Sequence, residues 1–295
     1  MKVAIFGRYY NVTTPTSVET LFNYLENQGI EAHIETEFYS LIDRESHSIK
    51  DFKNYKTFTE LDTDFDFLVS IGGDGTILRA TMFVKDLGIP IIGINTGRLG
   101  FLATIQVNAI EKAIQDIIDG NYRISERSLL SVETSSGNKD IKAMNFALNE
   151  ISVSRKNTTA MITIDTYLDD EFLNSYWSDG LIVSTPTGST GYSLSCGGPV
   201  ITPGSSSFVL TPIAPHNLSA RPLVIPDSTE IHLRVNGREK THLISLDSRI
   251  ATLDNGTLIK IKKANFKIKM IDLLNESFLD TLRKKLLWGE DKRNK

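Results

Sequence analysis

Cysteine is almost absent from this sequence, in which Cys196 is the only one among 295 residues. No disulfide can therefore form within the chain, and a single thiol fits a reducing compartment. Long apolar runs are also absent: none approaches the length of a membrane span, and the run at residues 1–7 is too short for a secretory signal peptide. These absences predict a cytoplasmic protein with no membrane partner.

An excess of basic charge is missing too. The 32 Lys and Arg residues are outnumbered by 36 Asp and Glu residues, which gives a net charge of −4. No basic cluster is dense enough for a nucleic-acid surface, and the basic residues near the C-terminus fit a solvated chain end. We therefore expect no nucleic-acid partner. The length of 295 residues suggests one large or two medium domains, and a hydrophobic fraction of 40% supplies ample material for a globular core.

The first part of the chain alternates strand-like and helix-like segments. This rhythm is typical of a parallel sheet covered by helices, and it predicts an α/β domain over residues 1–121. Gly29 and Gly120 mark two helix ends. The segment 39–64 is polar and poorly patterned, so it is predicted to be a mobile excursion. Strands are expected at residues 2–6, 30–36, 67–71 and 89–94, and helices at 17–28, 76–83 and 107–118.

From about residue 122 the rhythm changes to short alternating strands. Turn signals such as Asn236-Gly237 separate them, which predicts an all-β domain over residues 122–272. A helical pattern at residues 277–288 then predicts a final helix within a last segment, 273–295. Strands are expected at residues 129–134, 161–167, 180–184, 208–213, 231–235, 242–245, 257–261 and 266–271.

The sequence I-G-G-D-G-T at residues 71–76 follows a buried strand, where glycine N–H groups can approach a phosphate closely. It is not a P-loop, because the chain has no Gly-Lys pair. It is not the dinucleotide fingerprint either, because Leu78 occupies the third glycine position and the ribose-binding acid is missing. Asp74 is unexpected there, since a carboxylate repels phosphate. Taken alone, it could simply cap the following helix.

Two further polar groups stand in the second half of the chain. Asn149 and Glu150 are an amide and an acid side by side after a strand-like segment, and alone they could be an ordinary polar pair at a strand edge. Residues 178–199 form a buried strand followed by a loop crowded with hydroxyls and glycines. Such density suits the many hydrogen-bonding groups of a nucleotide. A turn-rich loop would explain the glycines but not the clustered hydroxyls of Thr187, Ser189, Thr190 and Ser193.

Taken in order, these segments resemble the NAD kinase family. Spacing and order agree from about residue 65 to 225, and five motifs in order are far more specific than any one. The G-G-D-G element by itself is shared with lipid kinases and phosphofructokinases. The matching motifs are G-G-D-G-T at 72–76, N-T-G-R-L-G-F at 95–101, L-N-E at 148–150, the stretch 179–199 and P-H-N-L-S-A-R-P-L at 215–223.

The resemblance implies phosphorylation of the 2′-hydroxyl of the adenosine ribose of NAD, with ATP or another phosphoryl donor, to give NADP. A divalent cation, Mg²⁺, would offset the negative charge; no residues are assigned as its ligands. The resemblance also implies a homo-oligomer, dimer or tetramer, whose NAD pockets are completed across subunits. The implied fold is a Rossmann-like parallel-sheet domain and an all-β NAD-binding domain, with the C-terminal helix returning to the first domain.

The resemblance also assigns roles to residues. Asp74 would be the general base that accepts the hydroxyl proton, which explains an acid beside the phosphate site. Gly72, Gly73, Gly75 and Thr76 would form the phosphate loop. Asn149 would bind adenine, Glu150 the ribose hydroxyls and Asp179 the nicotinamide end. Further NAD contacts are implied for Gly75, Arg79, Thr187, Thr190, Gly191, Tyr192, Ser193, Leu194 and Ser195.

Two positions depart from the family pattern, and one more residue is a candidate. Many relatives have alanine in place of Gly191, and many have a basic residue in place of Trp177. Arg249 is a further candidate for the NAD site. Arg79 could equally be a surface charge on its helix.

Two alternative functions share part of this pattern. A lipid or diacylglycerol-type kinase would have the G-G-D-G loop, but it gives no reason for Asn149-Glu150 or the hydroxyl loop. A non-catalytic NAD(P)-binding regulator would keep the pocket and lose turnover, and the presence of Asp74 argues against it.

Overall fold

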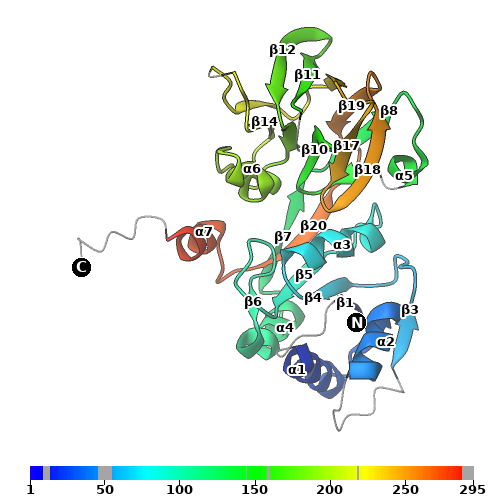
Figure 1. Cartoon of the computed structure of the whole chain (residues 1–295). Coiled ribbons are helices and arrows are strands. Elements are labelled where there is room, and N and C mark those ends of the chain that lie inside the picture. Colours follow the sequence, from blue (N-terminus) through cyan, green and yellow to red (C-terminus); the bar gives the residue numbers. More distant parts are fainter. Residues whose placement is uncertain (9–13, 46–54, 144, 158–159, 218, 288–295) are drawn as a thin grey trace, which may run out of the picture. The chain divides into compact units, whose positions relative to one another are not determined.

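The computed structural model describes residues 1–8, 14–45, 55–143, 145–157, 160–217 and 219–287. The chain forms two compact units (Figure 1). The first combines Met1–Glu126 with Ile268–Lys295, and the second is Arg127–Lys267. None of the helices in the described ranges has the length and apolar character needed to span a membrane.

The first unit is built on a largely parallel sheet with the strand order β3-β2-β1-β4-β5-β20-β7, and β6 pairs with β5. Strand β4 is buried along its whole length, as expected for the centre of a sheet covered on both faces. The strands are β1 (Lys2–Gly7), β2 (Glu31–Glu35), β3 (Lys56–Phe58), β4 (Phe67–Ile71), β5 (Ile91–Asn95), β6 (Ile105–Gln106), β7 (Tyr122–Arg127) and β20 (Ile268–Leu273).

Helices cover both faces of this sheet. Side chains alternate along β4, so Phe67, Val69 and Ile71 join a core with α1, α2 and α4. Helix α3 packs on the opposite face, where Phe83 lies with its ring centre 5.0 Å from that of Phe6. The helices of this unit are α1 (Thr14–Asn27), α2 (Thr36–Glu45), α3 (Asp74–Val84), the short 3₁₀ turn η2 (Val107–Ala109), α4 (Ile110–Ile118) and α7 (Phe278–Leu286).

The strand order places residues 72–76 where open α/β sheets bind ligands. Strand β1 pairs with β2 on one side and with β4 on the other, so the strand order reverses between β1 and β4. Ligands of such sheets bind at the carboxyl ends of the strands beside this reversal. Asp74 follows the carboxyl end of β4 directly, because α3 begins only three residues after Ile71.

The second unit is a sandwich of two six-stranded antiparallel sheets, β15-β14-β13-β10-β17-β18 and β12-β11-β16-β19-β8-β9. Inward-facing residues of both sheets form one apolar core. The strands are β8 (Leu130–Thr134), β9 (Phe146–Ala147), β10 (Glu150–Arg155), β11 (Ile162–Leu168), β12 (Glu171–Ser178), β13 (Gly180–Ser184), β14 (Ser207–Ile213), β15 (Leu223–Pro226), β16 (Ile231–Gly237), β17 (Thr241–Leu246), β18 (Arg249–Asp254) and β19 (Leu258–Lys263). Its helical turns are α5 (Lys139–Ala143), η3 (Gly188–Thr190) and α6 (Tyr192–Ser195).

The predicted fold class is confirmed: a parallel-sheet unit, an all-β unit and a C-terminal helix in the same unit as the first sheet. The segment 39–64, expected to be a mobile excursion, contains regular structure at both ends: α2 runs to Glu45, and β3 lies at Lys56–Phe58. Buried Phe38 and Ile42 anchor α2 to the core. Residues 46–54 lie outside the described part of the chain, as does the predicted helix end at 288 with the tail 289–295.

Strand β20 (Ile268–Leu273) has an alternating pattern that predicts a strand but not the sheet to which it belongs. Its sequence looks like one more strand of the all-β half, yet it joins the first sheet, where Met270 pairs with Ile91 of β5. An alternating pattern predicts a strand but carries no information about which sheet the strand enters. The chain therefore returns to the first unit already at β20, before α7.

Candidate active site

Asp74 is the first residue of α3, but it does not cap the helix. The N-cap position is Gly73, and no side chain makes a capping hydrogen bond there. The Asp74 carboxylate instead accepts three backbone N–H groups from a loop far along the chain. Oδ2 accepts from Phe101 at 2.8 Å, and Oδ1 accepts from Leu102 at 3.0 Å and Ala103 at 2.9 Å. The interpretation of Asp74 as a helix cap is therefore wrong.

The loop after β5 is shaped to receive this carboxylate. A Cβ atom at Gly100 would lie 1.9 Å from Asp74 Oδ1, so only glycine permits the approach. The side chain of Asn95 donates to the carbonyl oxygens of Arg98 at 2.7 Å and Ala103 at 3.0 Å, and thereby ties the two ends of the loop together. The N-T-G-R-L-G-F motif thus serves to hold Asp74.

The glycines before and after Asp74 have different structural reasons. At Gly72, whose φ is +152°, a Cβ atom would lie 2.2 Å from the Oγ1 atom of buried Thr76, so close packing requires glycine there. Gly73 and Gly75 are exposed, and a Cβ at either would meet nothing within 4 Å. Contacts inside the protein therefore do not explain these two glycines. Arg79 lies one turn further along α3 and is half-buried.

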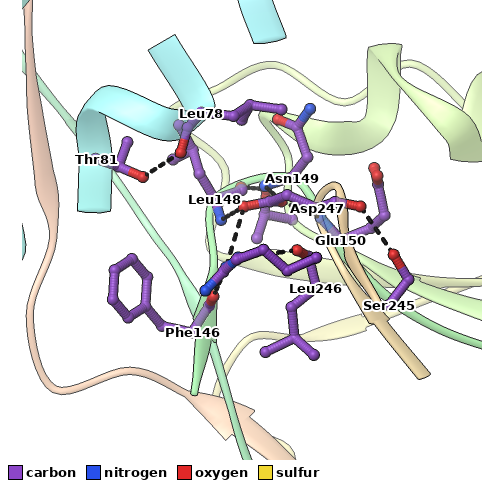
Figure 2. Close-up of polar contacts among 11 residues, drawn as sticks. Leu78, Thr81, Phe146, Leu148, Asn149, Glu150, Ser245, Leu246 and Asp247 are labelled. Carbon is purple, nitrogen blue, oxygen red and sulfur yellow. Dashed lines mark hydrogen bonds and ion pairs between the residues drawn. The ribbon is translucent and has the colours of Figure 1, made fainter. Parts of the chain in front are cut away.

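In the second unit, Asp247 organises the backbone around Asn149 and Glu150 (Figure 2). Its carboxylate accepts the N–H groups of Leu148 at 3.1 Å, Asn149 at 2.8 Å and Glu150 at 3.2 Å. The Asp247 side chain is only 3% exposed, and its φ of +52° is one that Asp tolerates better than most residues. In Figure 2 the side chains of Asn149 and Glu150 extend away from this carboxylate.

The Asn149–Glu150 pair carries two buried oxygens that have no hydrogen-bond partner in the described part of the chain, Oδ1 of Asn149 and Oε2 of Glu150. Burial, and after it the negative charge of Asp247, raise the pKa of Glu150 from 4.5 to about 8, although the backbone N–H of Tyr192 opposes this. Glu150 is therefore mostly protonated at neutral pH. Unsatisfied buried acceptors are uncommon in folded proteins and mark places where a ligand can supply the missing donors.

The loop after β13 packs closely on this pair. A Cβ atom at Gly188 would lie 2.1 Å from the carbonyl oxygen of Asn149, so that glycine is required. A Cβ atom at Gly191 would lie 3.3 Å from Oε2 of Glu150 and 3.5 Å from Nδ2 of Asn149. The hydroxyl of Thr185 fastens the loop by donating to the carbonyl oxygen of Leu148 at 2.6 Å. Gly191 therefore lies directly beside the two unsatisfied side chains.

Part of the hydroxyl cluster has a structural explanation. Ser189 Oγ donates to the carbonyl oxygen of Pro186 at 2.7 Å, and Ser193 Oγ shares a hydrogen bond with Thr211 Oγ1 at 2.8 Å. Both serines are fully buried. The hydroxyl of Thr190 donates to the carbonyl oxygen of Thr187 at 3.2 Å. The hydroxyls of Ser189 and Ser193 hold the loop together. The prediction that the structure of the loop would not explain these hydroxyls is therefore wrong for both serines.

The remaining predicted residues of this loop differ in exposure. Thr187 is 7% exposed and Tyr192 44% exposed, Leu194 is half-buried, and Ser195 is exposed. Burial raises the pKa of the Tyr192 hydroxyl, and the charges of Cys196, Asp179 and Glu150 add to this effect. Tyr192 and Glu150 therefore belong to one electrostatic environment that also includes Asp179.

Asp179 connects β12 to β13 and is paired. Its Oδ2 accepts from the Arg155 guanidinium at 2.8 Å, and the two side chains are 29% and 27% exposed. Trp177, at the end of β12, is 45% exposed and lies with its ring centre 4.3 Å from that of His216. The loop after β14 therefore covers one face of the indole.

Arg249 contacts Asp247, the residue that holds the Asn149–Glu150 backbone. It donates to the carbonyl oxygens of Phe146 and of Leu246, the latter at 3.2 Å, and its guanidinium is 3.7 Å from Asp247. It also borders a small hollow, about 120 Å³ in volume, together with Asp140 and Ile250. Arg249 supports Asp247.

Sequence reasoning missed the N–H groups of residues 101–103 in the first unit and Asp247 in the second. An acid after a strand looks like an ordinary turn residue, and backbone donors have no sequence signature. The available signal was indirect: Gly100 stands in a loop after a buried strand, which suggests close approach of another group.

Comparisons with known proteins agree over both units. A family model described as the ATP-NAD kinase N-terminal domain matches residues 3–122, and one described as the ATP-NAD kinase C-terminal domain matches residues 148–273. The chain is 55% identical over 294 residues to a NAD kinase from Flavobacterium johnsoniae and 56% identical over 294 residues to one from Christiangramia forsetii. In both cases the match covers 100% of each chain.

Two solved structures share the fold over nearly the whole chain. Yeast NADH kinase complexed with NADH matches with a TM-score of 0.85 and 25% identity, covering 100% of this chain and 89% of that one. An NAD kinase from Archaeoglobus fulgidus in complex with ATP matches with a TM-score of 0.74 and 27% identity, covering 97% of this chain and 99% of that one.

Two glycines of one loop provide a matched test of the Asp74 contact. Gly100→Ala should destabilise the first unit by about 1–3 kcal/mol, because the new Cβ collides with the Asp74 carboxylate. Gly97→Ala should change stability by less than about 0.5 kcal/mol, because the nearest atom to its Cβ is 4.0 Å away. Differential scanning calorimetry of both variants measures this, and equal melting temperatures would contradict the geometry.

The raised pKa of Glu150 predicts a pH-dependent stability. Its folded-state pKa of about 8 lies above its ordinary value of 4.5, so its contribution is complete below pH 4.5 and is lost as pH rises through about 8. Glu150→Gln keeps a neutral side chain at every pH and should remove this dependence. Melting temperatures of the two proteins across this interval should therefore diverge. Parallel profiles would show that Glu150 titrates normally.

Proposed function

Since the chain belongs to the NAD kinase family, we propose that it transfers the γ-phosphoryl group of ATP to the 2′-hydroxyl of the adenosine ribose of NAD, forming NADP and ADP. The relatives named NAD kinase cover the chain from end to end. The solved relatives bind NADH in one case and ATP in the other.

The observation that carries the proposal is the pair of unsatisfied oxygens on Asn149 and Glu150. An adenosine offers the matching donors, because adenine has an exocyclic amino group and ribose has hydroxyls. We assign the amino group to Asn149 Oδ1 and a ribose hydroxyl to Glu150. Asp247 supports this assignment by fixing the backbone of both residues while leaving their side chains available.

Asp74 acts as the base through its Oδ2 atom. A carboxylate offers about four lone-pair positions, and three of them accept the N–H groups of residues 101–103. The remaining position is on Oδ2, which carries a single hydrogen bond. It can accept the proton of the 2′-hydroxyl as the oxygen attacks phosphorus. Because both oxygens are held by the backbone, the carboxylate is already oriented before the substrates bind.

The glycines around Asp74 supply the phosphate side of the reaction. Gly73 and Gly75 leave open space where a larger residue would project, so the phosphates can approach the backbone N–H groups. Arg79 follows on the same helix and contributes positive charge. Phosphoryl transfer depends mainly on such positioning and on neutralising the charge of the phosphates.

The remaining predicted contacts complete the NAD site. Tyr192 presents an exposed ring that can pack on a base or ribose, and Asp179 binds the nicotinamide end. We assign Thr187, Thr190, Gly191, Leu194 and Ser195 to the lining of the same pocket, and fully buried Ser193 to the support of this loop through its hydrogen bond with Thr211. Trp177 offers an exposed indole face for stacking where many relatives carry a basic residue, and Arg249 contributes from behind the pocket.

A divalent cation is supplied together with ATP. Among the described residues, no group of three or more His, Cys, Asp or Glu side chains is placed to hold a metal ion. Mg²⁺ in nucleotide enzymes is commonly held by phosphates and only one or two carboxylates, so the donor set fits a cation that arrives with its nucleotide. Asp74 is the acid that stands within the phosphate loop at residues 72–76. We further propose a cytoplasmic homo-oligomer.

The lipid-kinase alternative is less well supported. It would require only the glycine–aspartate loop of the first unit, whereas the similarity extends through residues 148–273, most of which lie in the second unit. The decisive experiment is a coupled assay of the purified protein with ATP, Mg²⁺ and NAD. NADP should form only when all three are present. Failure to form NADP, with the folded protein confirmed by circular dichroism, would refute the proposed function.

Asp74→Asn tests the base. The amide cannot accept a proton at neutral pH, so kcat should fall by roughly a hundredfold or more. The variant also places an N–H₂ group against backbone N–H donors, and it should therefore lose about 1–3 kcal/mol of stability. Kinetics must be measured well below its melting temperature. Asp86→Asn, at an exposed acid just beyond α3, removes the same charge and should leave kcat unchanged.

NAD affinity separates the two roles of Asp74. Calorimetric titration should show that Asp74→Asn still binds NAD, because the adenosine contacts lie in the second unit. Near wild-type turnover in this variant would return Asp74 to a purely structural role.

A further inference from the structure

The C-terminal helix of the first unit contacts the loop that holds Asp74. Thr104 Oγ1 donates a hydrogen bond of 2.6 Å to Oε2 of Glu276, just before α7. The ring of Phe101 packs against that of Phe278, the first residue of α7, with ring centres 6.3 Å apart. Both contacts join residues that are far apart in the chain but belong to one compact unit.

A third contact comes from the last turn of α7. Lys285 Nζ donates to the carbonyl oxygen of Leu99 and lies 5.6 Å from the centre of the Phe101 ring. The ammonium group therefore binds the loop backbone and an aromatic face together. The helix segment thus contacts the loop before, within and after the three residues 101–103 that donate their N–H groups to Asp74.

The position of α7 is itself well determined. Strand β20 fixes its start by pairing with β5 at Met270 and Ile91. Ser277 then caps the helix: its Oγ accepts the N–H of Asp280 at 3.1 Å. Buried Leu282 anchors the helix on the unit. The helix can therefore act as a firm support for the loop.

We propose that α7 is a positioning element of the active site. Through Glu276, Phe278 and Lys285 it holds residues 99–104 in place, so that their N–H groups orient the Asp74 carboxylate toward the hydroxyl it deprotonates. This inference rests on the proposed function in assigning catalysis to Asp74. The geometric part, that α7 holds the loop, does not depend on it.

The other ties of the loop lie within it or on Asp74 itself: the N–H of Gly100 donates to the carbonyl oxygen of Ala103 at 3.2 Å, and the N–H groups of residues 101–103 bind the Asp74 carboxylate. Asn95 links residues 95, 98 and 103, and Gly100 has no side chain with which to anchor the middle. Leu99 and Phe101 are held by α7 from outside. A shift of the loop by about 1 Å would turn the carboxylate away from its acceptor geometry, and misplacements of that size can lower a rate by as much as about a hundredfold.

The test compares two neighbouring lysines. Lys285→Met removes the loop contact, whereas Lys284→Met makes the same chemical change at an exposed position one residue earlier on the helix. Thr104→Val removes the donor to Glu276 with little change of shape, and Thr104→Ser restores it. The double variant Lys285→Met/Thr104→Val should lower kcat about tenfold, with the KM values for NAD and ATP within about twofold.

Amide hydrogen exchange supplies a readout that does not involve activity. The N–H groups of Phe101, Leu102 and Ala103 should exchange faster in the double variant than in the wild type or Lys284→Met. Lys285→Met/Thr104→Ser should recover part of both the protection and the rate. Melting temperature, measured in parallel, ensures that kinetics are recorded on folded protein.

The outcomes separate the two hypotheses. Absence of NADP formation by the wild type would refute the proposed function, while exchange would still report whether α7 holds the loop. With an active wild type, wild-type exchange in the double variant would overturn the inference. Faster exchange with unchanged kcat, or a changed KM with unchanged kcat, would overturn it as well, since the helix would then be merely structural.

Discussion

Three backbone N–H groups converge on the carboxylate of Asp74, and the conformation of the loop after β5 depends on that contact. Gly100 is a glycine because the carboxylate approaches too closely for any Cβ. Asn95 ties the loop ends so that three consecutive N–H groups point the same way. A charged acceptor bound by several neutral donors is held more firmly than by one.

The second unit uses the same physical solution for a different purpose. Asp247 also accepts three consecutive N–H groups, but it is almost wholly buried and turns its carboxylate to the backbone of residues 148–150. These three hydrogen bonds hold the backbone of residues 148–150 in place. The side chains of Asn149 and Glu150 are thereby left with unsatisfied oxygens. In the proposed mechanism Asp74 keeps an acceptor position for the proton of the 2′-hydroxyl, whereas Asp247 leaves acceptor positions on its neighbours.

Charge and burial act together at Glu150. A carboxyl group removed from water and placed near Asp247 resists ionisation, which is why its pKa rises to about 8. A protonated carboxyl can both donate and accept a hydrogen bond, so it can pair with ribose hydroxyls in either direction. The neighbouring Gly191 keeps the space beside Glu150 open, because a Cβ there would lie 3.3 Å from Oε2.

Local sequence determined the elements and the position of the chemistry in this protein. Apolar runs and glycine stops were enough for most strands and helices of both units, and the order of motifs placed Asp74, Asn149 and Glu150 at strand ends. Tertiary structure alone decided which sheet β20 enters, which backbone groups hold Asp74 and Asp247, and how α7 supports residues 99–104. The reason is physical: periodicity reports the faces of an element, whereas a hydrogen bond between a side chain and a distant backbone depends on two chain paths meeting, and backbone N–H groups are the same in every residue but proline.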